Sequence, residues 1–142
     1  MRNLLVKKKS FTLIELLVAM GILAFVITGL LSLFLNIMFL NVSSRNTTIA
    51  ITHARNIFED IRNAPFAGLQ ARINAGGANG WDLNSAQLQA TYNLNPLPNE
   101  TIATSSPSAV GADPMEVSVQ ILWRDRGLRN RSFELRSLIT NF

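Results

Sequence analysis

The stretch FTLIELLVAMGILAFVITGLLSLFLNIMFL, residues 11–40, decides how this chain is built. It contains one ionisable side chain, Glu15, and it directly follows a basic run, Lys7, Lys8 and Lys9. As a helix rising 1.5 Å per residue it would be about 45 Å long, more than the roughly 30 Å hydrocarbon core of a bilayer. We therefore expect a membrane-spanning helix that stays apolar beyond the membrane. A strongly tilted helix in lipid alone is the alternative.

The carboxylate of Glu15 is the exceptional group in this helix. An ionised carboxylate in the centre of a bilayer costs about 2.5–3.5 kcal/mol, so we expect Glu15 to have a charged partner. The plain alternative is that Glu15 lies at headgroup depth beside the lysines.

The string KSFTLIELL, residues 9–17, resembles the processing and methylation site of type IV prepilins and of the pseudopilins of type II secretion. The resemblance implies that a membrane peptidase cuts between Ser10 and Phe11 and methylates the new amino group of Phe11. It also implies that Glu15 pairs with the amino terminus of a neighbouring subunit. Such an α-amino group, with a pKa of about 8, stays cationic near neutral pH. The family usually has Gly before the cut, where this chain has Ser10.

The charge of the chain is concentrated at its start. The formal net charge is +4, but four of the thirteen basic residues lie in residues 1–10, and the remainder has nine arginines against nine acids. The basic leader is therefore a topology signal: Lys7, Lys8 and Lys9 hold the amino terminus in the cytoplasm, and the chain crosses the inner membrane once with its carboxyl terminus outside. The chain has no cysteine, which excludes disulfides and thiolate sites.

The pattern after residue 40 predicts an α+β fold, in which a small head with an antiparallel β-sheet packs on the C-terminal half of the long helix. An apolar stripe with helical spacing should face that sheet: Ala50, Ala54, Ile57, Phe58 and Ile61. Arg55 and Glu59 are expected to form an i, i+4 ion pair, and Pro65 should end the helix near Asn63. A break is most favoured in the hydrophilic residues 41–48. The expected divisions are residues 1–10 (leader), 11–40 (transmembrane and assembly helix), 41–63 (amphipathic continuation), 64–114 (loop-rich variable region) and 115–142 (C-terminal β-hairpin).

Alternation of apolar and polar residues predicts a strand over residues 115–124 and a second over 132–140, joined by a turn around Gly127. A hairpin alone is marginally stable, so a third strand is expected from residues 81–102. Residues 64–114 otherwise indicate loops with little regular structure. The residues expected to anchor these loops to the core are Trp81, Leu83, Leu88, Tyr92 and Leu94.

The sequence gives little support to catalysis, a metal or a cofactor. His53 is the only histidine, and a lone histidine without a second ligand is expected to be a packing or surface residue. The glycine-rich residues 76–80 lack the preceding strand and the Gly-Lys-Ser/Thr of a phosphate-binding loop, so they indicate a flexible loop. We therefore expect a protein that is not an enzyme.

The resemblance implies a structural minor pilin or pseudopilin in a type IV pilus or type II secretion filament. Its partners would be other pilins or pseudopilins, the prepilin peptidase, an inner-membrane assembly platform and the membrane itself. One alternative is an uncleaved, signal-anchored envelope protein with a ligand-binding outer domain. Another is a competence-type minor pilin that binds DNA through clustered arginines. Those arginines are Arg124, Arg126, Arg129, Arg131 and Arg136.

Overall fold

The structure is a computed structural model that describes residues 12–109, 111–125 and 129–141. The chain divides into two compact units, Met1–Leu40 and Asn41–Phe142. We call residues 12–40 of the first unit the apolar segment and the second unit the head.

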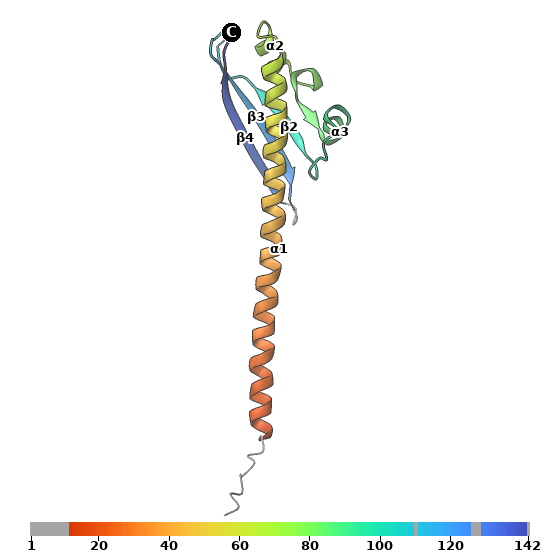
Figure 1. Cartoon of the computed structure of the whole chain (residues 1–142), viewed down its shortest axis with the longest axis vertical. Helices are drawn as coiled ribbons and strands as arrows, with labels where there is room; N and C mark the ends of the chain where they lie inside the picture. The colour runs from red at the N-terminus through yellow and green to blue at the C-terminus, as the bar shows by residue number, and fades with distance from the viewer. Residues whose placement is uncertain (1–11, 110, 126–128, 142) are drawn as a thin grey trace, which may run out of the picture. The chain divides into compact units, whose positions relative to one another are not determined.

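Helix α1, Leu13–Asn63, runs without interruption through 51 residues (Figure 1). The hydrophilic residues 41–48, the favoured place for a break, are helical throughout. The hydroxyl groups of Thr47 and Thr48 donate to carbonyl oxygens four residues earlier, at 3.0 and 3.1 Å, so these polar side chains are satisfied without opening the helix. The helix ends where Pro65 predicts.

The head contains one antiparallel sheet of four strands, β1 (Leu83–Asn84), β2 (Thr101–Ser105), β3 (Met115–Arg124) and β4 (Asn130–Ile139), in the order β1-β2-β3-β4. The two long strands β3 and β4 are the predicted hairpin, with Val119 opposite Leu135 and Ile121 opposite Phe133. Residues 81–102, from which a third strand was expected, contain β1 and the first two residues of β2. Gly127, the predicted turn residue, lies outside the described residues. The α+β fold class is confirmed.

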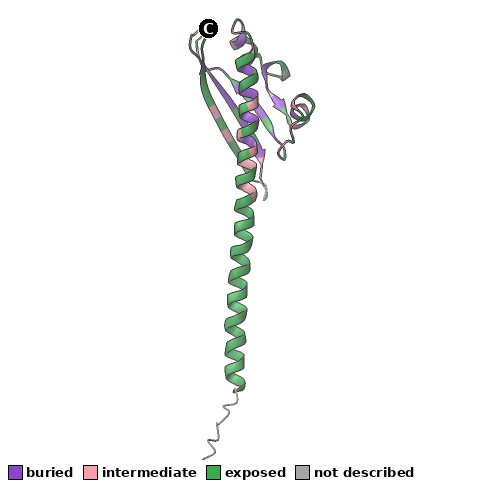
Figure 2. Ribbon diagram, viewed as in Figure 1, coloured by how far each residue is buried: buried purple, intermediate pink, exposed green. Residues whose placement is uncertain are grey.

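The hydrophobic core lies between the sheet and the part of α1 that belongs to the head (Figure 2). The predicted stripe is the buried face of the helix: Ala50, Ala54, Ile57, Phe58 and Ile61. The inward-facing residues of β3 belong to the same core cluster: Met115, Val117, Val119, Ile121 and Trp123. The apolar face of α1, which has a 3.6-residue period, and the apolar face of β3, which has a two-residue period, therefore belong to the same core.

The expectation of little regular structure in residues 64–114 is wrong. This segment forms α2 (Leu69–Ala75), the 3₁₀ turn η1 (Ala78–Gly80) and α3 (Ser85–Tyr92), as well as β1 and β2. The residues that suggested loops act as helix ends: Asn84 and Gln87 form a capping box at the start of α3, and Gly76, with φ 66°, ends α2. Helices of seven and eight residues carry too few apolar positions to show a helical period.

The predicted apolar anchors do hold this segment on the core. Trp81, Leu83 and Leu88 are buried in the core, and Tyr92 and Leu94 are partly buried and pack against it. Helix α1 adds polar contacts through Asp60, whose Oδ2 accepts hydrogen bonds from Trp81 Nε1 at 2.7 Å and from the Tyr92 hydroxyl at 2.8 Å. Partial burial and this carboxylate raise the pKa of Tyr92 above its usual range, which keeps the phenol protonated as a donor.

The glycine-rich residues 76–80, expected to be a flexible loop, form a turn held at several points. The carbonyl of Asn79 accepts a hydrogen bond from Arg72 Nε at 2.7 Å, and the carbonyl of Gly80 accepts one from the hydroxyl of Thr104. A Cβ atom at Gly80 would lie 2.6 Å from the carbonyl oxygen of Arg72. Glycine is therefore required here by close backbone packing and not by phosphate binding.

The lone histidine has a structural partner. His53 on α1 is 3% exposed, and its Nδ1 lies 2.8 Å from Oε1 of Glu100, which is 1% exposed. The second carboxylate oxygen of Glu100 accepts a hydrogen bond from the backbone N–H of Leu97 at 2.6 Å. This buried pair joins α1 to the residue that precedes β2, so the expectation of a packing role for His53 is confirmed.

Replacing Glu100 should destabilise the head strongly. In Glu100→Ala both His53 Nδ1 and the Leu97 N–H lose their partner inside the core, which costs about 3–5 kcal/mol when a buried pair is broken on one side. The measurement is chemical denaturation of the full chain in detergent micelles, followed by tryptophan fluorescence. The matched control is Glu59→Ala, an exposed substitution on α1 that should stay within about 0.5 kcal/mol of the wild type. Equal stability of the two variants would contradict this assignment.

Candidate functional site

The first turn of α1 is capped by the side chain of Thr12, which was not among the predicted site residues. Thr12 precedes the helix, its Oγ1 accepts a hydrogen bond from the backbone N–H of Glu15 at 3.3 Å, and its carbonyl accepts one from Leu16 N–H at 3.2 Å. Thr12 is therefore the N-cap, and Glu15 occupies the third helical position. The spacing Thr-x-x-Glu in front of an apolar run is the sequence signal that could have predicted this cap.

Glu15 is the only ionisable side chain in described residues 12–44. It is exposed and lies in the first turn of α1, where the helix dipole favours a negative charge. Large apolar side chains surround it, with Leu13 82% and Leu16 55% exposed. Among the residues that the structure describes, Glu15 forms no ion pair. Its carboxylate is therefore available to a cation from elsewhere.

The other predicted site residues cannot be placed. Ser10 and Phe11, expected at the cleavage and methylation position, and the leader lysines Lys7, Lys8 and Lys9 lie outside the described residues.

The apolar segment exposes its hydrophobic side chains all around the helix. Twenty large apolar residues between Leu13 and Leu40 are 47–82% exposed, shown green in Figure 2. Burial of one such side chain is worth about 1.5–3 kcal/mol, so this surface requires lipid or other helices around it. By length and composition α1 can span a membrane, and none of its apolar window is buried. The helix fits a membrane-anchored protein.

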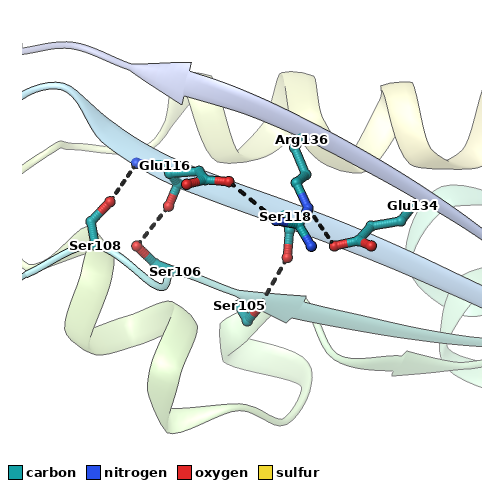
Figure 3. A network of polar contacts seen from close by, with 7 residues as sticks. All are labelled: Ser105, Ser106, Ser108, Glu116, Ser118, Glu134 and Arg136. Carbon is teal, nitrogen blue, oxygen red and sulfur yellow. Dashed lines mark hydrogen bonds and ion pairs between the residues drawn. The ribbon is translucent and has the colours of Figure 1, made fainter.

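No group of three potential metal ligands occurs among the described residues, and His53 is already engaged by Glu100. Serines at the end of β2 and in the loop that follows it form hydrogen bonds to β3 (Figure 3). Ser105 bonds Ser118 at 2.8 Å, Ser106 donates to the carbonyl of Glu116 at 2.8 Å, and Ser108 accepts from the Glu116 N–H at 2.7 Å.

The arginines of the hairpin differ in how they are paired. Arg136 lies 2.8 Å from Glu134 and 3.5 Å from Glu116, as Figure 3 shows, and these contacts raise the pKa of Arg136, with the Glu134 hydrogen bond as the largest cause. Arg131 lies 3.8 Å from Asp125. Arg124 has a buried Nε without a hydrogen-bond partner among the described residues, Arg129 is exposed, and Arg126 lies outside the described residues.

The predicted ion pair between Arg55 and Glu59 is not formed in the described head. Both side chains are exposed, and an i, i+4 pair with the basic residue first is the weaker orientation on a helix. Glu59 is consequently left without a charged partner on its own element.

Comparison with protein families gives one match: residues 5–31 fit the family model described as the prokaryotic N-terminal methylation motif. The chain carries the type IV prepilin-like signature. The matched residues of this prepilin-like chain include the leader lysines, Ser10, Phe11 and Glu15, and the motif is typical of structural, pilin-type proteins. The head lies outside the match. No curated protein and no solved structure matches the chain.

The N-cap of α1 yields a test of the local structure around Glu15. Thr12→Val keeps the size of the side chain but removes the acceptor for the Glu15 amide, and loss of an N-cap costs about 1 kcal/mol. Amide hydrogen exchange at Glu15, measured by NMR on the full chain in micelles, should accelerate by about fivefold. Thr12→Ser retains the hydroxyl and should exchange like the wild type. Identical rates in all three proteins would rule out the cap.

Proposed function

We propose that this prepilin-like chain is a minor pilin or pseudopilin, a non-enzymatic subunit of a type IV pilus or a type II secretion filament. One observation carries the proposal: Glu15 is a single exposed carboxylate, without an ion pair among the described residues, on a helix surface that is otherwise apolar. It lies inside the matched methylation motif. Such a group is costly in lipid and useful where another chain supplies a cation.

In this proposal the chain is first inserted in the inner membrane. Lys7, Lys8 and Lys9 hold the amino terminus in the cytoplasm, and the apolar segment crosses the bilayer with the head outside. The prepilin peptidase then removes residues 1–10 and methylates the amino group of Phe11, which remains cationic near neutral pH.

Assembly then exchanges lipid for other helices. This exchange is nearly neutral for the apolar side chains, because lipid tails and helix surfaces are both apolar. The carboxylate of Glu15 is different: an ionised carboxylate is costly in lipid, by about 2.5–3.5 kcal/mol at the centre of a bilayer, and that of Glu15 is neutralised when it meets the Phe11 amino group of a neighbouring subunit. The charge pair between Glu15 and the Phe11 amino group therefore favours transfer from lipid to the filament and selects the neighbouring subunit. Burial of apolar side chains alone does not drive this transfer. The assembly platform and other pilins are the proposed partners.

DNA is not part of the proposal. Two of the hairpin arginines, Arg131 and Arg136, are already opposite carboxylates within the head. An uncleaved anchored protein is the rival that the first experiment separates.

Processing can be read from the intact mass of the full chain extracted from membranes. With a coexpressed prepilin peptidase, we expect a species that begins at Phe11 and carries one additional methyl group. Without the peptidase, residues 1–10 should remain. A chain that keeps its leader under both conditions contradicts the proposal and favours the anchored-protein alternative.

The role of Glu15 can be separated from processing. Glu15→Ala should be cleaved normally, yet its share in the sheared filament fraction should fall by about tenfold or more, because the substitution removes both the penalty in lipid and the charge pair in the filament. Quantitative immunoblots of membrane and filament fractions give this ratio.

The matched control is Ser32→Ala, a polar-to-alanine change at an exposed position of the same helix that carries no charge. Its filament share should equal that of the wild type. Normal incorporation of Glu15→Ala would show that the carboxylate is dispensable for assembly.

A further inference from the structure

A cavity in the head is lined by two arginines. It has a volume of about 300 Å³ and lies between one face of α1, the loop that leads to β2 and the end of β3. Val42, Ile49 and Leu97 supply apolar lining, and Arg45 and Arg124 supply the charges. None of the residues that line it is acidic. The cavity therefore combines an apolar wall with an uncompensated positive charge.

Arg124 is held at this position by the backbone. Its N–H donates to the carbonyl of Pro98 at 2.8 Å, which ties the end of β3 to the loop. The side-chain Nε is buried and has no acceptor among the described residues. The nearby carboxylate of Asp125 is engaged by Asn46 Nδ2 at 3.1 Å and by Arg131. Arginine pairs with a planar oxyanion through two parallel hydrogen bonds, so a carboxylate is the ligand that suits this cavity.

One acidic residue in the described part of the head, Glu59, has no polar partner. Glu59 is exposed on α1 and makes no ion pair or side-chain hydrogen bond within the described residues. The other acids of the head all have polar partners: Asp60, Asp82, Glu100, Asp113, Glu116, Asp125 and Glu134. The unpaired carboxylate and the unpaired arginines are therefore complementary in charge.

One head cannot satisfy both groups by itself. Glu59 follows Arg45 by fourteen residues on the same helix, which corresponds to a separation of about 21 Å along the helix axis. A carboxylate from a second copy can reach the cavity if the two copies are displaced by this distance. We propose that the cavity beside Arg45 and Arg124 binds the Glu59 carboxylate of a second copy of this chain.

This contact joins different surfaces of the two copies. Each copy would still offer its own Glu59 to the next, and because successive copies are displaced along the helix axis, the contacts do not close into a ring and build an open array. The inference rests on the proposed function, because it supplies a head-to-head contact for the same filament. Glu15 would select the neighbour through the apolar segment, and Glu59 would fix the axial offset between heads.

Cross-linking of the full chain tests the contact. The sequence has no cysteine, so Arg45→Cys combined with Glu59→Cys gives the only two thiols. The Cα atoms of an arginine and a glutamate in an ion pair are farther apart than a disulfide permits, so a short bis-maleimide is the suitable reagent. We expect a ladder of covalent oligomers in membranes and sheared filaments. The control, Arg45→Cys with Ala90→Cys on the exposed surface of α3, should give several-fold less.

Charge exchange gives a second readout. Glu59→Arg should lower the filament share of the chain, and the combination Glu59→Arg with Arg45→Glu should restore most of it. An equal loss in the single and double variants overturns the contact and favours an anionic lipid headgroup as the occupant of the cavity. If no ladder exceeds the control while Glu15→Ala still blocks assembly, the head contact is wrong and the proposed function stands. If both tests fail, the filament proposal fails as well.

Discussion

The packing of α1 against β3 is the interaction on which the rest of the head depends. Ala50, Ala54, Ile57 and Ile61 of the helix are fully buried and belong to one core cluster with the branched residues of β3. Strands β2 and β4 pair with β3 on either side, and α2 contacts β2 while α3 contacts β1. Because the chain has no cysteine, this core is not reinforced by a disulfide.

The same helix meets two opposite requirements along its length. Residues 13–40 are apolar on every side, whereas the part within the head is apolar on one stripe only. The change occurs over a few turns rich in serine, threonine and asparagine, in which the hydroxyl groups of Thr47, Thr48 and Thr52 donate hydrogen bonds to the helix backbone. One continuous element can therefore suit two surroundings, and the single acid near its start is the only charge in the described apolar part.

Features that depend on local spacing could be predicted from the sequence. The buried stripe of α1 and the β3–β4 hairpin follow from periods of 3.6 and two residues, and the short string around Glu15 was sufficient to indicate the prepilin-like motif. The helices of residues 64–114 were not predicted because each is short and has too few buried residues to show a helical period. The pair between His53 and Glu100 joins residues 47 positions apart, and no local pattern encodes such a partner. Thr12 and Glu15 have the spacing of a helix cap. This signal was not recognised because both residues lie within the long apolar run.

The position of β4 at the end of the strand order leaves one long edge of the sheet unpaired in the head. An exposed edge of ten residues is a template for uncontrolled strand addition, and the hazard grows when many copies are confined to the plane of a membrane. Strand β4 carries Arg131, Glu134 and Arg136, and charged side chains on an edge strand oppose the addition of a further strand. These charged residues therefore oppose uncontrolled association of the heads through this edge of the sheet.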